Sequence, residues 1–122
     1  MARERPLRRG EVHWVNLHPR TGSEQRGHRP AVIVSHDVFN VHPRWNSLIV
    51  VPMSTSQRQL RNQGSSVRIE AGESGLRRTS VALCHQVTTI DRSKVGQPVG
   101  MLSLAALQRV EDGLRAALDL LP

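Results

Sequence analysis

The sequence has little of several residue types on which common protein architectures depend. Cys84 is the only cysteine among 122 residues, which excludes an internal disulfide framework and a zinc site built from cysteines. No apolar run approaches the roughly 18 residues of a membrane-spanning helix. The basic N-terminus MARERPLRRG has no apolar stretch behind it, which argues against a secretory signal. We therefore expect a cytoplasmic protein that does not associate with a membrane.

Aromatic residues and lysines are scarce as well. The three aromatic residues are Trp14, Phe39 and Trp45. They are too few for base stacking to dominate the recognition of a nucleic acid. Lys94 is the only lysine among 17 basic residues, and the net charge is +7. Residues 103–122 carry a net charge of −1, so residues 1–102 carry +8. Because guanidinium groups bind phosphates bidentately, we expect the front of the chain to contact an anionic partner.

The length and a hydrophobic content of 38% predict one domain over residues 1–122, with residues 1–8 as a basic and flexible N-terminal tail. Short segments rich in β-branched residues predict six strands, at residues 11–17, 31–35, 47–51, 66–70, 80–84 and 87–90. The second and third of these segments are almost continuously apolar, which is typical of strands buried on both faces. The fourth alternates and is expected to be half exposed.

A C-terminal helix is indicated by apolar residues that recur every three or four positions from Leu104 to Leu121, with Ser103 as its N-cap. Its apolar stripe is expected to pack on the sheet. Gly113 within it costs about 1 kcal/mol relative to alanine, so packing must stabilise the helix. The sequence therefore predicts a mainly β fold of five to six antiparallel strands followed by one helix, as a small barrel or strongly curled sheet.

Two polar segments hold most of the candidate chemistry. The loop from residue 18 to residue 30 gathers several ionisable side chains, namely Arg20, Glu24, Arg26, His28 and Arg29. Pro30 biases Arg29 towards an extended conformation at the entrance of a strand, which suits a precisely aimed guanidinium. The second segment, Pro52-Met-Ser-Thr-Ser56, places hydroxyl groups where a buried strand runs out. A solvated loop and turn-forming serines are the simpler interpretations of these two segments.

Several familiar site motifs are missing. The sequence has no Gly-x-Ser-x-Gly elbow and no phosphate-cradling glycine-rich loop, which argues against acyl-transfer hydrolysis and nucleotide hydrolysis. Six histidines are present, but none forms an HExxH or similar pair at helical spacing, so we expect neither a metal site nor another cofactor.

A series of blocks, in order and at similar spacing, resembles the MazF/PemK toxins of toxin–antitoxin modules. The resemblance covers roughly residues 8–121, and its blocks are RGEVHWV from Arg9, GSEQ from Gly22, GHRPAVIVS from Gly27, Asn40, VVPMSTS from Val50, SVALCHQV from Ser80, residues 96–100 and the final helix. It implies an SH3-like β-barrel with a C-terminal helix that works as a homodimer. It also implies metal-independent, sequence-selective cleavage of single-stranded RNA, usually mRNA.

The residues that the family uses for this reaction correspond here to Arg29 and Ser54, with Glu24 as a weaker candidate. In metal-free cleavage, the 2′-hydroxyl of the RNA attacks its own phosphate, so charge on the phosphorane must be stabilised and protons must be transferred. Arg29 suits charge stabilisation, and Ser54 suits hydrogen bonding to a phosphate oxygen or orienting the 2′-hydroxyl. The general base stays open among Glu24, His28, His85 and Arg29 itself.

The chain departs from the family at two positions. Ser54 stands where many members have threonine, which keeps the hydroxyl group. His85 stands where members often have aspartate, which removes a negative charge and introduces a group that titrates near neutral pH. Gln86, which follows it, is a further candidate for catalysis or substrate binding. Arg26, Thr55, Arg58 and Arg61 are expected to contact the RNA. Trp14 is expected in the core, whereas Trp45 is the better candidate for a surface contact.

The expected partners are single-stranded RNA, a second copy of the chain and a cognate antitoxin whose acidic segment would complement the basic surface. Two alternatives stay open. One is a non-catalytic toxin of the same fold that poisons DNA gyrase by protein contacts, since a fold does not fix a function. The other is a basic nucleic-acid-binding module. The net negative charge and apolar stripe of the only strong helix argue against it.

Overall fold

The computed structural model describes residues 6–17, 22, 27–56, 58, 60 and 64–120. Within these residues the strands are β1 (Glu11–Asn16), β2 (His28–Ile33), β3 (Ser47–Ser54), β4 (Ser66–Ile69), β5 (Ser80–Leu83), β6 (Thr88–Asp91) and β7 (Val95–Met101). The helices are α1 (Asp37–Asn40), α2 (Ala71–Ser74) and α3 (Leu104–Leu118), with short 3₁₀ turns η2 (Cys84–Gln86) and η3 (Arg92–Lys94). The mainly β architecture with a C-terminal helix is thus confirmed.

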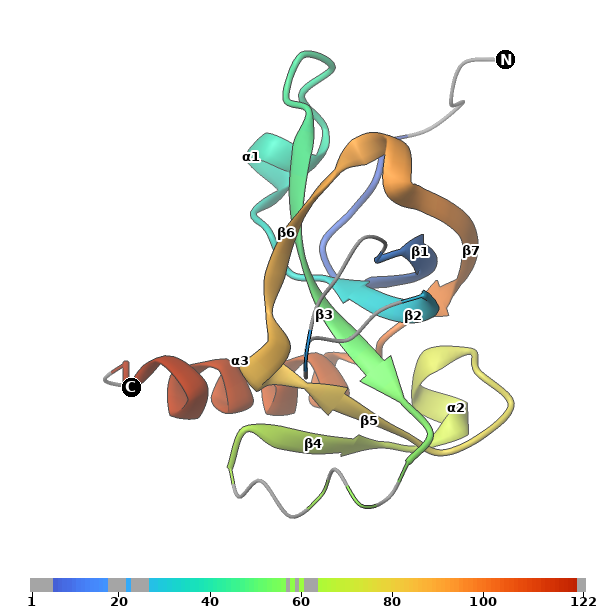
Figure 1. Ribbon diagram of the computed structural model, residues 1–122, viewed down its shortest axis with the longest axis vertical. Coiled ribbons are helices and arrows are strands. Elements are labelled where there is room, and N and C mark those ends of the chain that lie inside the picture. Colours follow the sequence, from blue (N-terminus) through green and yellow to red (C-terminus); the bar gives the residue numbers. More distant parts are fainter. Residues whose placement is uncertain are drawn as a thin grey trace.

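The seven described strands form one antiparallel sheet that curls around β3. Its order is β4-β5-β3-β2-β1-β7, and β6 also pairs with β3. The first half of β3 pairs with β6 and its last two residues pair with β5, so β3 runs between two groups of strands (Figure 1). Among the described strands β4 and β7 remain at the two edges, so the sheet is curled but not closed into a barrel. The structure describes seven strands where five to six were expected. The strand that was missed is β7, because it contains Gly96, Pro98 and Gly100, and glycine and proline are uncommon in strands.

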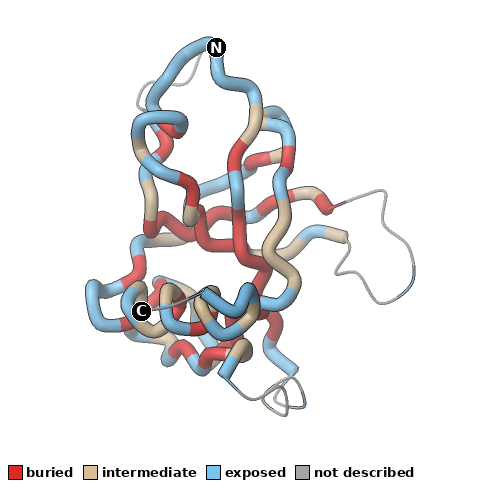
Figure 2. The backbone as a smooth tube through the Cα atoms, turned by 90° about the vertical axis from the view of Figure 1, so that its left-hand side faces the viewer, coloured by how far each residue is buried: buried red, intermediate tan, exposed pale blue. Residues whose placement is uncertain are grey.

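Two apolar clusters occupy the two faces of β1, β2 and β3. Val12, Val32 and Val51 belong to the cluster beneath α3, whereas their neighbours Ala31 and Val50 belong to the other cluster. Alternate residues therefore point to opposite buried faces, which explains the unbroken apolar runs in β2 and β3. Figure 2 shows the buried residues concentrated along these strands and the exposed ones along the turns.

The N-terminal segment begins to pack before the first strand. Leu7 is 1% exposed and belongs to the second apolar cluster, so the part of the expected 1–8 tail that the structure describes is anchored in the core. Residues 1–5 of that tail lie outside the described residues. Arg9 is fixed as well, because its guanidinium donates to the Val34 carbonyl at 3.0 Å and forms an ion pair with Glu111 at 2.7 Å.

The C-terminal helix α3 lies alongside β4 and η2 (Figure 1). Ser103 caps it as expected, because its Oγ accepts a hydrogen bond from the backbone N–H of Ala106 at 3.1 Å. Ala106 and Val110 are fully buried, but Leu104, the first residue of the expected stripe, is 87% exposed and lies outside the core. None of the described helices combines the length and the hydrophobicity needed to span a bilayer.

Candidate nucleic-acid cleavage site

A cavity of about 520 Å³ opens where β2 begins and β3 ends. From β2 it is lined by His28, Arg29 and Pro30, and from the end of β3 by Ser54 and the following Thr55. The two polar segments singled out in the sequence are therefore adjacent in space. Four of the expected site residues, His28, Arg29, Ser54 and Thr55, line the same cavity.

Arg29 and Ser54 come together because β2 and β3 are antiparallel neighbours. Their pairing runs from Ile33–Val50 to Ala31–Pro52, and continuing that register by two residues sets Arg29 opposite Ser54. Pro30 and Pro52 have no backbone N–H to donate to a ladder. The pairing of β2 with β3 ends at Pro52, and the cavity begins there.

The hydroxyl group of Ser54 is oriented by a turn. Ser54 is 7% exposed, and its Oγ accepts a hydrogen bond from the backbone N–H of Ser56 at 3.1 Å. The turn-forming role expected of this segment is therefore real, and it leaves the hydroxyl proton available for an acceptor in the cavity. No described residue accepts that proton.

Part of the cavity lining was not anticipated from the sequence. It comprises Leu76, Arg77 and Arg78, from the segment between α2 and β5, and Ser80 at the start of β5. Arg77 and Arg78 are exposed, whereas Ser80 is buried. Adjacent arginines just before a strand were the available signal, but nothing in the local sequence indicated that this loop lines the same cavity as Arg29.

Trp14 also lines the cavity, together with Pro98 and Val99 of β7. Its side chain is 42% exposed, so the expectation that Trp14 belongs to the core was wrong. By strand alternation Trp14 shares a face of β1 with the buried Val12, but this end of the strand borders the cavity instead of the core. Beside it the pairing with β7 is irregular: His13 pairs with Pro98 and Val15 with Val95, so β7 has one residue more than β1 in this interval. Such bulges often occur beside functional sites.

The charge of the cavity is positive. Its described lining residues include three arginines and His28 and no carboxylate. Guanidinium groups and a hydroxyl donor converge there, which is the donor set that a phosphodiester requires. The cavity can thus bind a phosphodiester and stabilise the additional negative charge of a pentacoordinate phosphorane.

Other expected site residues lie elsewhere. His85 and Gln86 belong to η2, at the opposite end of β5 from Ser80, and do not line the cavity. Arg58 is exposed and is likewise not part of its lining. Glu24, Arg26 and Arg61 lie outside the described residues. The roles expected of these residues stay predictions. In the part of the chain that the structure describes, no three His, Cys, Asp or Glu side chains gather as metal ligands.

Comparison with known proteins identifies the family. The family model described as the PemK-like, MazF-like toxin of type II toxin–antitoxin systems matches residues 8–118. The chain belongs to this family. It is similar to Endoribonuclease EndoA of Bacillus subtilis (strain 168), with 31% identity over 115 residues that cover 94% of this chain and 97% of that protein.

Solved structures share the fold of this MazF-like chain. MazF from Deinococcus radiodurans superposes with a TM-score of 0.78 at 22% identity, over 95% of this chain and 99% of that one. An endoribonuclease from a Mycobacterial species, solved in complex with its cognate antitoxin, gives a TM-score of 0.77 at 22% identity, over 95% and 98% of the two chains. The MazF-like fold expected from the sequence is therefore confirmed.

Proposed function

We propose that this MazF-like toxin is an endoribonuclease that cleaves single-stranded RNA at the cavity lined by Arg29 and Ser54. The observation that carries the proposal is the convergence of a guanidinium and an oriented hydroxyl in a cavity whose described lining contains no carboxylate. The similarity to an endoribonuclease over almost the whole chain supports it. We place this toxin in the cytoplasm, where its substrate is found.

The proposed reaction is a transesterification that uses the substrate's own nucleophile. The 2′-hydroxyl oxygen forms a bond to the adjacent phosphorus, and the bond from phosphorus to the 5′-oxygen of the next nucleotide breaks. The nucleophile loses its proton to a base, and the leaving oxygen gains one. The products are a 2′,3′-cyclic phosphate and a 5′-hydroxyl end, so no metal ion is required.

Each cavity residue suits one part of this reaction. Arg29 stabilises the charge on the non-bridging oxygens of the phosphorane, since its planar donors match two phosphate oxygens. Ser54 donates its hydroxyl proton to a non-bridging oxygen, while the Ser56 N–H holds its Oγ in place. His28 is the described lining residue suited to proton transfer near neutral pH.

A related toxin has been solved with its cognate antitoxin, and we propose that such a partner also controls this toxin. The cavity is basic and the chain has a net charge of +7, so an acidic antitoxin segment would complement its surface.

We also propose that the toxin is a homodimer. Exposed hydrophobic side chains lie from α1 to the first half of β3, namely Val38, Phe39, Val41, Trp45 and Ile49. Phe39 and Trp45 pack against each other, with ring centroids 4.7 Å apart and ring planes inclined by 38°. An exposed apolar patch of this kind is typical of a protein–protein interface.

The test is a cleavage assay on a long RNA of mixed sequence in EDTA. We expect defined cuts by the wild type, loss of about a hundredfold or more in rate for Arg29→Ala, and a smaller but clear loss for Ser54→Ala. Arg44→Ala, a change in the loop after α1, is the matched control and is expected to retain wild-type activity. Intact RNA with folded wild-type protein would refute the proposal and favour a toxin that acts by protein binding.

A further inference from the structure

The loop between α2 and β5 is held in place at nearly every residue except its two arginines. Gly75 has φ +85°, and a Cβ atom there would lie 2.7 Å from the Val99 carbonyl oxygen, so the loop begins pressed against the backbone of β7. The backbone N–H of Leu76 donates to Ser74 Oγ at 3.0 Å, and the Leu76 side chain packs against the apolar cluster beneath α3. The start of the loop is therefore anchored.

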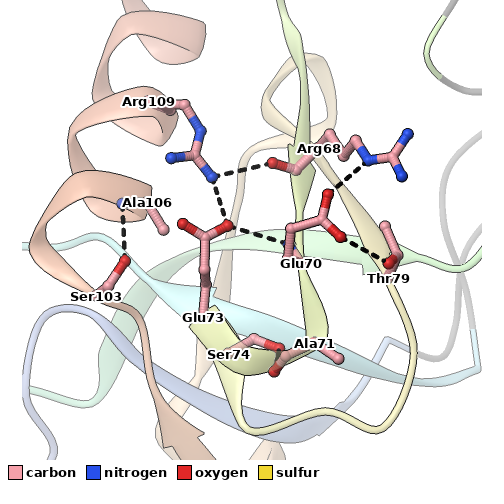
Figure 3. A network of polar contacts seen from close by, with 9 residues as sticks. All are labelled: Arg68, Glu70, Ala71, Glu73, Ser74, Thr79, Ser103, Ala106 and Arg109. Atoms are coloured by element: carbon pink, nitrogen blue, oxygen red, sulfur yellow. Dashed lines mark hydrogen bonds and ion pairs between the residues drawn. The ribbon is translucent and has the colours of Figure 1, made fainter.

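The end of the loop is anchored as well. Thr79 Oγ1 donates to Glu70 Oε1 at 3.1 Å, and Ser80 Oγ donates to the Arg78 carbonyl at 3.2 Å. Figure 3 shows Thr79 and Glu70 within a larger network in which Glu73 binds Arg109 of α3. The loop is thus built to present residues 77 and 78 in a fixed position.

The side chains at these two positions have no role in holding the fold. Five other arginines of the described chain do have one, because their guanidinium groups form hydrogen bonds or ion pairs, namely Arg9, Arg68, Arg92, Arg109 and Arg115. The guanidinium groups of Arg77 and Arg78 make no hydrogen bond or ion pair with any described residue. Two adjacent, exposed and unneutralised cations on the wall of a cavity favour a ligand with negative charge.

Trp14 adds a flat apolar surface beside these cations. It pairs with Pro30 of β2 on one side, and the bulge of β7 before Pro98 lies on the other. Both prolines and the 42% exposed indole line the cavity. Rigid neighbours on both sides restrict the ring, and an indole in this position can stack on an unpaired base at little cost in conformational entropy.

We infer that Arg77 and Arg78 bind the phosphodiester next to the scissile one. We also infer that Trp14 stacks on the base of the nucleotide between these two phosphodiesters. This inference rests on the proposed function of the cavity and extends it to a second nucleotide. The substrate is single-stranded, because a base in a duplex does not expose its face to an aromatic side chain. Arg77, Arg78 and Trp14 are binding and positioning residues, whereas Arg29 and Ser54 act at the reacting phosphate.

The first experiment measures binding of an oligoribonucleotide that spans a mapped cut and carries a 2′-deoxynucleotide at the cut, so that it is not cleaved. For Arg77→Ala/Arg78→Ala we expect a dissociation constant raised about tenfold or more and a salt slope reduced by about 0.7, the value for one phosphate that is no longer neutralised. Arg8→Ala/Arg44→Ala removes the same charge outside the cavity and is expected to keep the wild-type slope. Equal slopes for the two double variants would overturn the inference.

Steady-state kinetics separate this role from catalysis. The same Arg77→Ala/Arg78→Ala variant is expected to raise KM about tenfold with little change in kcat, because the lost contact binds the ground state and the transition state alike. A fall in kcat at unchanged KM would contradict a binding role.

Fluorescence tests the stacking directly. In Trp45→Phe, Trp14 is the only tryptophan, and RNA is expected to quench its emission by a base–indole contact. Trp14→Ala is expected to weaken binding about tenfold and Trp14→Phe much less. Saturating RNA without a change in emission would overturn the stacking. If the wild type cleaves no RNA, the proposed function fails and this inference fails with it. If the wild type cleaves RNA but the Arg77→Ala/Arg78→Ala variant keeps the wild-type salt slope and RNA leaves the Trp14 emission unchanged, only this inference is refuted.

Discussion

Gly113 of α3 meets Cys84 of η2 so closely that a Cβ atom at Gly113 would lie 2.7 Å from Cys84 Sγ and 2.8 Å from Val67 Cγ2. The glycine in the middle of the helix, costly in propensity, is therefore what allows α3 to approach the sheet. Helix and sheet share one apolar cluster at this point, to which Cys84 and Val110 belong.

Gly113→Ala is expected to destabilise the fold by about 1–3 kcal/mol, because overpacking outweighs the gain of about 1 kcal/mol in helix propensity. Gly72→Ala in α2 is the matched control, since a Cβ atom there meets nothing within 4 Å. Urea unfolding of both variants measures the difference. A Gly113→Ala protein as stable as Gly72→Ala would contradict the packing argument.

The Cys84 thiol is expected to be unreactive in the folded protein. Burial raises its pKa to about 12, so the nucleophilic thiolate is almost absent at pH 8. Its Sγ also donates to the Val110 carbonyl at 3.5 Å. Ellman's reagent should react with this thiol only at the rate of unfolding and rapidly in denaturant. A fast reaction at pH 8 without denaturant would show that the helix does not cover it.

The ion pair between Glu73 and Arg109 is expected to make stability depend on acid pH. The hydrogen bond from Arg109, at 2.6 Å, lowers the pKa of Glu73 below the ordinary value of a glutamate side chain. A carboxyl with a lowered pKa contributes stability above its unfolded pKa, and this contribution is lost as the pH falls through the folded pKa. Glu73→Gln should therefore flatten the loss of stability below pH 4.5, as measured by denaturation at several pH values.

The partner residue provides the check on this ion pair. Arg109→Gln should flatten the same acid limb, and the double variant should lose no more than either single one. Because both side chains are partly exposed, the coupling free energy is expected to be about 1 kcal/mol or less at pH 7. Additive effects of the two substitutions would mean that they act on separate contacts.

Arg92 is expected to hold the segment after α1 in place. Its guanidinium donates to the carbonyls of Asn40 at 2.9 Å and Trp45 at 2.7 Å, among others. Arg92→Lys should cost about 1–3 kcal/mol, because an ammonium group cannot reproduce this planar set of donors. Arg44→Lys, in the same segment, serves as the control. Limited proteolysis should cut the Arg92→Lys protein faster between residues 41 and 46, and equal rates would contradict this role.

The proposed homodimer is tested at Val38, which is 62% exposed and can therefore change without disturbing the core. Val38→Asp is expected to convert a dimer into a monomer, because it places a charge in an apolar interface. Light scattering coupled to size exclusion measures the mass, and Leu104→Asp on the exposed start of α3 is the control. A dimer that survives Val38→Asp would place the interface on another surface.

Much of the fold was predictable because its signals are local. Apolar β-branched runs marked six of the seven described strands, and Ser103 marked the start of α3 through its capping hydroxyl. The seventh strand, β7, carries glycine and proline at positions that propensity assigns to turns, and it forms only because β1 offers it a pairing partner.

Of the residues that line the cavity, those at the start of β2 and the end of β3 were predicted from the sequence. Arg29 and Ser54 were expected from the resemblance to the family, and they lie in strands whose antiparallel pairing brings them together. Trp14 was misplaced, because its exposure depends on the cavity beside this end of β1, which its neighbours in the sequence do not indicate. Arg77 and Arg78 were missed for a similar reason, since their position depends on contacts between α2, β7 and α3 that no local pattern indicates.

The close approach of Gly75 and Gly100 fixes the backbone of the loop that carries Arg77 and Arg78, whatever side chains stand at those two positions. Neither position admits a side chain, since a Cβ atom at either would lie 2.7 Å from a carbonyl oxygen. Contacts at both ends of the loop hold its backbone, so residues 77 and 78 can be substituted without changing the conformation of the loop. If the two arginines hold a phosphate as inferred, a library randomised at these two positions alone would yield toxins that share one framework and differ in how tightly they hold the RNA backbone.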